Sequence, residues 1–274
     1  MIYQYIAPHP SLREFVRDIL IADFEFDKSK PVPFKAFSPR PELAITFLPN
    51  SKLTRVNLSN GESHASPSAS ICGQQITRYN FHIPHNFQMI RVNFHPGALY
   101  RLIGVPLYEF TNSWFDAELA INHEIIEVNE RLSNCTDYAS MIKLVEEYLQ
   151  SKIERINTDT HPVDRIAGYI LSNPAGHSLD WLANQACLSP RQLNRKFKER
   201  MGIGPKLFSR IVRFFHAYKY KESHLQEDWL SVALQFGYTD YQHLVRDFRE
   251  FACVTPNIWI KQDNHSPERI LQLQ

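Results

Sequence analysis

The sequence predicts an α+β protein, with a β-barrel-like domain and trailing helices in its N-terminal half and an all-α domain in its C-terminal half. Three observations lead to this fold class. Residues 1–150 carry short β-branched and aromatic runs separated by turn formers, which is typical of strands. Residues 163–262 show apolar residues at helical spacing between recognisable caps. Within that second region, one unit of two short helices occurs twice.

The N-terminal strands are expected where short apolar runs occur. LREFVRDILIADFEF (12–26) and PELAITFLP (41–49) are such runs, and QMIRVNF (88–94) alternates its side chains between two faces. Turn-forming stretches such as KSKPVP, PNSK, SNGES and HIPHN punctuate these runs. The pattern predicts a small antiparallel barrel or sandwich.

Helical segments follow these strands. A helix near 97–103 is expected to stop at Gly104, and two longer helices are expected at about 117–132 and 136–155. The last of them carries an apolar stripe, which fits either core packing or a contact between two copies of the chain. The stripe consists of Met141, Leu144, Val145, Tyr148 and Leu149. The polar segment 156–162 is expected to link the two domains.

The C-terminal half contains an internal repeat. Residues 183–208, ANQACLSPRQLNRKFKERMGIGPKLF, align with residues 233–259, ALQFGYTDYQHLVRDFREFACVTPNIW, with one inserted residue at Tyr241. The offset between matched residues is 50 before the insertion and 51 after it. The pairs that match in type include Leu193 with Leu244, Arg195 with Arg246, and Phe197 with Phe248. The repeat indicates two copies of one structural unit.

Each copy has the pattern of two helices around a tight turn. In the first copy, Ser189 stands at a capping position and Pro190 follows at the first helical position. In the second copy, Gly237 supplies the turn, and Thr239 or Asp240 caps the second helix. Two short helices, a turn of three or four residues and a polar second helix are the signature of a helix-turn-helix.

The polar faces of the two second helices match the chemistry of base recognition. The major groove of B-DNA admits an α-helix, in which Arg pairs with guanine and Gln or Asn with adenine. The alternative is that each polar face is simply exposed to solvent, which is the more common interpretation of a single polar helix face. Two matched copies favour DNA binding. The candidate DNA-binding residues are Arg191, Asn194, Arg195, Lys198, Tyr241, Gln242, His243, Arg246 and Arg249.

The distribution of charge agrees with this interpretation. Residues 1–160 contain fifteen basic and eighteen acidic residues, whereas residues 161–274 contain fifteen basic and eleven acidic ones. Within the second half, residues 191–200 hold five bases and one acid. A local basic helix of this kind indicates contact with phosphates, for which Lys198 and Arg249 are the candidates. A connecting helix at 204–223 would set the two reading helices about one DNA turn, ~34 Å, apart.

At this level of detail the C-terminal half resembles the AraC/XylS family of bacterial transcription regulators. The segment GYTDYQHLVRDFREFACVTP follows that family's end pattern, with Cys253 where a glycine is usual, and the resemblance runs from about Val163 to Lys261. It implies two recognition helices that enter successive major grooves. The residues implied to read bases are Arg191, Asn194 and Arg195, followed by Tyr241, Gln242, His243 and Arg246.

The N-terminal half is similar to the sensory domain of one AraC-type subgroup. The similar segments are YIAPHPSLREFV and RVNFHPGALYRLIGVPLYEF, and they imply a barrel-like domain that receives a small-molecule effector. The effector and its pocket are not identified by the sequence. Six aromatic residues either line such a pocket or fill the core, namely Phe24, Phe26, Phe37, Phe47, Phe81 and Phe94.

Enzyme signatures are missing from the sequence. There is no GxSxG, P-loop or GxGxxG pattern, the four cysteines form no CxxC pair, and no cofactor or metal is expected. His82, His85 and His95 are close in sequence, which suggests as an alternative a cupin-like metal-dependent enzyme fused to a DNA-binding domain. The three histidines lack a carboxylate at useful spacing, which argues against this alternative. No apolar run approaches the ~18 residues of a membrane span, and no signal peptide is recognised, which favours a cytoplasmic protein.

These observations predict a ligand-responsive transcription regulator that is not an enzyme. Its partners would be double-stranded promoter DNA, an unknown small-molecule effector, RNA polymerase and a second copy of the chain. A DNA-binding protein whose N-terminal domain only mediates oligomerisation is a further alternative. The predicted organisation is a β-rich sensory or dimerisation domain at 1–155, a linker at 156–162, a DNA-binding domain at 163–262 and a C-terminal tail at 263–274.

Overall fold

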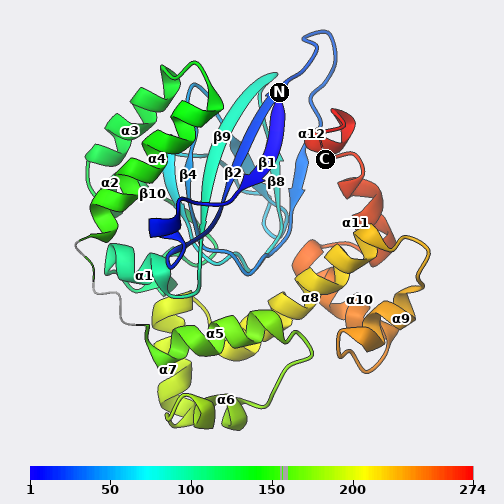
Figure 1. Cartoon of the computed structure of the whole chain (residues 1–274). Coiled ribbons are helices and arrows are strands. Elements are labelled where there is room, and N and C mark those ends of the chain that lie inside the picture. Colours follow the sequence, from blue (N-terminus) through cyan, green and yellow to red (C-terminus); the bar gives the residue numbers. More distant parts are fainter. Residues whose placement is uncertain (155, 157–159, 274) are drawn as a thin grey trace.

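A computed structural model describes residues 1–154, 156 and 160–273, and it divides into two parts (Figure 1). The N-terminal part combines ten strands with helices packed along one side of the larger sheet. The described residues of the C-terminal part form only helices. This arrangement confirms the predicted α+β class. Among the described residues, every helix is too short or too polar to serve as a membrane span.

The strands form two antiparallel sheets. The larger sheet has the order β1-β2-β9-β4-β7-β10, and the smaller sheet has the order β3-β8-β5-β6. The strands are Ile2–Ile6 (β1), Val16–Glu25 (β2), Lys35–Phe37 (β3), Ala44–Phe47 (β4), Thr54–Asn57 (β5), Ser63–Ala65 (β6), Ala69–Cys72 (β7), Tyr79–His82 (β8), Asn86–Phe94 (β9) and Trp114–Asp116 (β10). In the described residues the two sheets do not join into a closed barrel.

Strand β9 shows how the sheets are covered. The sequence alternates there, yet every residue from Ile90 to Phe94 is buried. Ile90 and Val92 belong to the core that packs against the helices of the N-terminal part. Arg91 and Asn93 point to the other face, where the smaller sheet excludes solvent. The strand therefore buries polar side chains on one face and apolar ones on the other.

The helices of the N-terminal part agree with the predicted helices, with one exception. They are Ala98–Ile103 (α1), Ala117–Ala120 (α2), Glu124–Ser133 (α3) and Tyr138–Ile153 (α4), with short 3-10 helices at Pro10–Leu12 and Leu107–Phe110. Helix α1 ends at Gly104, as predicted. The single helix predicted at 117–132 is wrong, because the chain breaks at residues 121–123. Helix α2 contacts strands β7 and β10, whereas α3 contacts β7 and also packs on α4.

The apolar stripe of α4 lies inside this chain's own core. Met141, Leu144, Val145, Tyr148 and Leu149 are all buried together with residues of the larger sheet. The stripe is therefore core packing, and it offers no exposed seam to a second copy of the chain.

The C-terminal part is built from eight helices in the described residues. They are Pro162–Ser172 (α5), Leu179–Gln185 (α6), Pro190–Met201 (α7), Pro205–Ser223 (α8), Trp229–Gln235 (α9), Tyr241–Ala252 (α10), Pro256–Asp263 (α11) and Pro267–Ile270 (α12). Helix α8 is the predicted connecting helix. Of the linker predicted at 156–162, residues 157–159 lie outside the described residues, and α5 already begins at Pro162.

The two copies of the repeat share their backbone geometry at two left-handed positions. In the turn before the second helix, Cys187 (φ 54°) of the first copy corresponds to Gly237 (φ 77°) of the second. After the second helix, Gly202 (φ 87°) corresponds to Cys253 (φ 59°). Each copy thus has glycine at one left-handed position and cysteine at the other. A side chain is strained there, because Cβ crowds the backbone when φ is positive.

We expect Cys253→Gly to raise the free energy of unfolding by about 0.5–1 kcal/mol, because glycine adopts positive φ without strain. Cys253 is exposed and ends α10, so the change removes little buried contact. Equilibrium unfolding in urea measures the effect. The matched control is Cys135→Gly, a residue without positive φ just beyond α3, where glycine should not stabilise the protein. A loss of stability in Cys253→Gly would contradict the assignment of strain.

The N-terminal domain contacts both helical units. On the first unit, Tyr100 donates from its hydroxyl to the Glu199 carboxylate (2.7 Å), and Thr111 donates to the carbonyl of Gly202 (2.9 Å). On the second unit, Arg78 donates to the carbonyl of Ala252 (3.0 Å). A change in the N-terminal domain can therefore reach both copies of the repeat.

Candidate DNA-binding surface and interdomain cavity

The first helix-turn-helix unit consists of α6 and α7. The Ser189 hydroxyl accepts from the amide of Gln192 (3.3 Å), and the Gln192 side chain accepts from the Ser189 amide (2.9 Å), which forms a capping box at the start of α7. Leu193 and Phe197 are fully buried and fix which side of α7 faces the core. The opposite side is left to solvent.

The predicted DNA-binding residues of α7 differ in exposure. Arg191, Arg195 and Lys198 are exposed. Asn194 is half-buried, and its Oδ1 lies so close to Gly204 that a Cβ there would approach it to 2.7 Å. Asn194 therefore packs against the start of α8, whereas the three basic side chains are free to contact a ligand.

The second unit consists of α9 and α10. Asp240 caps α10 by accepting from the amide of His243 (2.7 Å), which settles the choice between Thr239 and Asp240. Of the predicted residues, Gln242, Arg246 and Arg249 are exposed, whereas Tyr241 and His243 are half-buried. The His243 ring lies edge-on to Tyr238, with ring centroids 5.2 Å apart.

A buried acid on α10 was not found by sequence reasoning. Asp247 is only 1% exposed, and its carboxylate accepts from Arg210 (2.7 Å) and from the Tyr238 hydroxyl (3.0 Å), with Arg213 at 3.6 Å. Arg210 also binds Glu250 (2.6 Å). Two arginines three residues apart on α8 thus face two acids three residues apart on α10. This spacing was visible in the sequence, but the pairing of the two helices was not.

A basic cleft separates the two units. Its wall combines one side of α8, one side of α10 and the loop before α6. Lys206, Arg210, Arg213 and Arg246 contribute four cations, against the acids Asp247 and Glu250. The surface between the two predicted reading helices is therefore positive, as contact with a phosphate backbone requires.

A second cavity lies in the N-terminal domain, between the two sheets. Its cavity volume is about 70 Å³. Its aromatic walls are formed by Tyr3, Tyr5, Phe24, Phe37, Phe81 and Phe87. Of the six phenylalanines considered in the sequence, Phe24, Phe37 and Phe81 line the cavity. Phe47 and Phe94 instead lie in the core under the helices. Phe26 is partly buried and packs against a smaller apolar cluster around Phe24. The C-terminal tail also reaches the cavity, where Pro267 and Glu268 line it and Glu268 is paired with Lys35.

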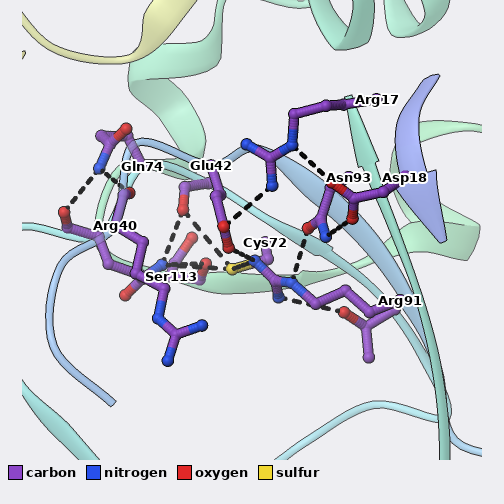
Figure 2. A network of polar contacts seen from close by, with 12 residues as sticks. Arg17, Asp18, Arg40, Glu42, Cys72, Gln74, Arg91, Asn93 and Ser113 are labelled. Atoms are coloured by element: carbon purple, nitrogen blue, oxygen red, sulfur yellow. Dashed lines mark hydrogen bonds and ion pairs between the residues drawn. The ribbon is translucent and has the colours of Figure 1, made fainter. Parts of the chain in front are cut away.

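A network of buried polar groups forms one side of this cavity (Figure 2). Glu42 accepts from Arg17 (3.0 Å) and lies 3.8 Å from Arg91. Arg91 donates to Asn93 (3.0 Å), which in turn donates to Asp18 (2.6 Å). Burial raises the pKa of Glu42, but the nearby arginines outweigh this effect and hold the pKa below its ordinary value. Glu42 is therefore a carboxylate whose charge is matched by Arg17, Arg40 and Arg91.

Arg40 stands apart from this network. Its Nε is buried and has no hydrogen-bond partner, and no ion pair to its guanidinium occurs within the described residues. The guanidinium lies 5.0 Å from the centroid of the Phe37 ring. Figure 2 shows that only the Arg40 carbonyl oxygen takes part in the hydrogen bonds, through Gln74 (2.8 Å). Burial lowers the pKa of Arg40, but Tyr218 and Glu42 outweigh this effect and raise its pKa above the ordinary value. Arg40 thus brings a positive charge to a mostly aromatic cavity without a direct ion pair.

The three histidines considered as metal ligands have other surroundings. His85 contacts the carbonyl of Lys30 (3.0 Å), and the ring of His82 lies 6.0 Å from that of Phe34. Burial lowers the pKa of His95. Among the described residues, no three His, Cys, Asp or Glu side chains come together as a set that could hold a metal ion.

Two family models match the chain. Residues 182–262 match a helix-turn-helix domain, and residues 4–116 match a domain of unknown function, DUF6597. No curated protein matches the chain in sequence. The first match runs from within α6 to one residue before the end of α11, and the second covers all ten strands except the start of β1.

Three solved structures illustrate what the chain is similar to. A structure of ToxT from Vibrio cholerae has a TM-score of 0.50 at 10% identity, covering 89% of this chain and 98% of that chain. ToxT with a bound unsaturated fatty acid has a TM-score of 0.48 at 10% identity, covering 89% and 95%. The DNA-binding domain of AdpA in complex with a target DNA has a TM-score of 0.36 at 19% identity, covering 38% of this chain and 95% of that chain. The first of these likenesses shows a shared two-domain fold.

Proposed function

We propose that this protein is a sequence-specific, DNA-binding transcription regulator of the AraC type that responds to a small-molecule effector, and the match of residues 182–262 to a helix-turn-helix domain supports this. The observation that carries the proposal is the pair of matched helices, α7 and α10. Each buries its apolar side and leaves arginines exposed, and a basic cleft lies between them. Such an arrangement suits two stretches of major groove separated by a phosphate backbone.

The predicted residues take separate roles in this proposal. Arg191 and Arg195 on α7, and Gln242 and Arg246 on α10, are the exposed side chains that would read base edges. Asn194, Tyr241 and His243 are half-buried and would contact DNA from the edge of each helix or orient its neighbours. Lys198 and Arg249 would bind phosphates, together with Lys206 in the cleft.

The cavity in the N-terminal domain supports an effector site. A domain that only mediated oligomerisation would have no need of a cavity with aromatic walls. An effector acts by binding two states of the protein with unequal affinity. The contacts of the N-terminal domain with both helical units give it a route to alter DNA affinity or contact with RNA polymerase.

We expect Arg195→Ala to remove base preference at one position of the DNA site, with a loss of about 1–3 kcal/mol there. The side chain is exposed on α7, and its charge lowers the pKa of Glu199 after the contributions of Tyr100 and Lys196. Selection from a randomised DNA pool measures the preference. Arg165→Ala is the matched control, because Arg165 is also exposed in this domain but lies on α5. An unchanged preference in Arg195→Ala would contradict its role.

Lys198→Ala should weaken binding to all DNA sequences to a similar extent. A phosphate contact carries no information about the base. Without this contact, DNA binding releases one fewer counterion, so the negative slope of log K against log salt should become shallower by about 0.9. Titrations at several salt concentrations give this slope. Lys143→Ala on α4, which is exposed on the other domain, should leave it unchanged. A loss confined to one base pair would show that Lys198 reads sequence.

A further inference from the structure

Glu250 on α10 faces the basic cleft between the two helix-turn-helix units. Arg210 on α8 donates to both oxygens of its carboxylate, from Nη1 to Oε1 (3.0 Å) and from Nη2 to Oε2 (2.6 Å). Both side chains line the cleft. The side chain of Glu250 is 52% exposed and that of Arg210 is 30% exposed. The pair therefore lies at the surface of the cleft, where a ligand that enters would meet it.

Glu250 changes the charge of the cluster to which it belongs. Asp247 lies beneath the pair with 1% of its side chain exposed, 2.7 Å from Arg210 and 3.6 Å from Arg213. These two arginines and one acid carry one positive charge, which Glu250 cancels. The cleft as a whole is lined by four cations and two acids, so its wall carries two positive charges with Glu250 and three without it. Lys206 and Arg246 are the other two cations.

The repeat does not require an acid that faces the cleft. At the offset of 51, Glu250 corresponds to Glu199 of the first copy, and Asp247 corresponds to Lys196. The carboxylate of Glu199 accepts from the hydroxyl of Tyr100 (2.7 Å) and from Lys196 (3.0 Å), so it serves the contact with the N-terminal domain. The same position in the two copies thus has two different uses, and the use in α10 concerns the cleft.

A phosphate can take the place of the Glu250 carboxylate. A guanidinium binds carboxylates and phosphates in the same bidentate geometry, with two parallel N–H···O hydrogen bonds. An ion pair that is partly exposed to water contributes little to stability, so its exchange for another anion costs little. Arg210 keeps its contact with Asp247 during such an exchange, and Glu250 can turn into solvent.

We propose that Glu250 occupies the place of a DNA phosphate at Arg210 in the free protein, and that it limits the affinity of the cleft for the DNA backbone without reading sequence. The proposal rests on the proposed function and adds a residue that sets the strength of DNA binding. When DNA binds, a phosphate oxygen replaces the carboxylate at Arg210. The released carboxylate stays near the backbone and retains a cation there, so fewer counterions are released in total.

The test is the salt dependence of DNA binding by Glu250→Gln in the full chain. Glutamine keeps the size of the side chain and one acceptor for Arg210, and it removes the charge. Fluorescence anisotropy follows the binding of two duplexes, one recovered by selection from a randomised pool and one of the same length with a scrambled sequence. We expect the slope of log K against log salt to become steeper by about 0.9 for both duplexes.

The same change in slope fixes the expected gain in affinity. Acting over about one decade of salt below 1 M, it corresponds to binding that is roughly eightfold tighter at about 0.1 M salt. The gain should shrink as the salt concentration approaches about 1 M, because the effect is electrostatic. The base preference found by selection should stay the same, since a phosphate contact carries no sequence information.

Two further variants separate the charge in the cleft from other effects. Glu147→Gln is the matched control, because Glu147 is also an exposed acid (55%) beside a cation, Lys143 at 3.8 Å, but it lies on α4 of the other domain. It should alter neither affinity nor slope. Glu250→Asp retains the charge, so its slope should stay closer to that of the unaltered chain than the slope of Glu250→Gln does.

The opposite role for Glu250 gives results of the opposite sign. If the pair with Arg210 serves to hold α10 on α8, Glu250→Gln should bind DNA more weakly, lose base preference or fail to fold, and each of these results overturns the proposal. Unchanged affinity would show an ordinary surface ion pair. An equal gain in Glu147→Gln would assign the effect to the net charge of the chain, and a gain on the selected duplex alone would assign it to base reading.

The proposed function is tested separately, by the base preference of the unaltered chain. If that preference is found and Glu250→Gln brings no gain, only the present inference fails. If no preference is found and Glu250→Gln still tightens binding to both duplexes, the proposed sequence-specific function fails and the exchange at Arg210 stands.

Discussion

Asp164→Ala is expected to lower the free energy of unfolding by about 3–5 kcal/mol, because it leaves a buried guanidinium without its partner. Arg200 donates from Nε and from Nη2 to the two carboxylate oxygens of Asp164, each at 2.6 Å. Both residues are buried, and they join α5 to α7. The loss would therefore fall on the helix that carries the proposed base-reading arginines. Urea unfolding followed by tryptophan fluorescence measures it.

A variant that lacks both charges shows whether the loss of stability comes from the unpaired Arg200 charge or from lost packing. Asp164→Leu combined with Arg200→Met should recover most of the stability, because apolar replacements of a buried ion pair are often neutral or better. If the double variant is as unstable as Asp164→Ala, the loss does not come from the unmatched charge. The backbone of Gly97 packs closely against Asp164, since a Cβ at Gly97 would lie 2.1 Å from the Asp164 carboxylate.

Arg78→Ala is expected to destabilise the contact between the N-terminal domain and the second helical unit by about 3 kcal/mol, since hydrogen bonds of a charged group contribute ~1.5–3 kcal/mol. Its Nη1 donates to the Ala252 carbonyl (3.0 Å) and to Gln262 (2.7 Å), and its guanidinium lies over the Trp259 ring. Hydrogen–deuterium exchange of residues 252–263 should rise steeply, because the carbonyl loses a donor and the indole loses its cover.

Arg55 provides the matched control for this prediction. It is a buried arginine of the same domain, but it donates to Ala65 (3.0 Å) and lies over Trp114, so its contacts stay within the N-terminal domain. Arg55→Ala should loosen that domain and leave exchange at residues 252–263 unchanged. Equal exchange at 252–263 in the two variants would show that Arg78 has no special part in holding the domains together.

The parts of the fold that depend on neighbouring residues could be predicted from the sequence. The capping of α7 by Ser189 and Pro190, and the end of α1 at Gly104, are set within a few residues of chain. The repeat also predicted which side of α7 and α10 is buried, because apolar residues four apart define one face of a helix. The break at residues 121–123 was missed, since it depends on how α2 and α3 pack on different partners.

The parts that depend on distant residues could not be predicted in this way. Lys35 and Glu268 meet across almost the whole chain, and no pattern near either residue indicates the other. The strand phenylalanines could not be sorted, because both faces of the larger sheet are covered. Phe24 therefore faces the cavity and Phe47 the core although their local sequences look alike. Asp247, which binds Arg210 and Arg213, could not be predicted either, because the pairing of α8 with α10 depends on residues far apart in the sequence.

The late position of the tail in the chain has a consequence for protein synthesis. The ribosome completes strands β1 to β9 long before it reaches Pro267 and Glu268. At roughly 5–20 residues per second, the interval is on the order of ten seconds or more, and N-terminal domains generally fold first. A newly made copy thus passes through a period in which its pocket lacks one wall and Lys35 lacks its glutamate. During this period the proposed effector site is more open to solvent than in the finished molecule.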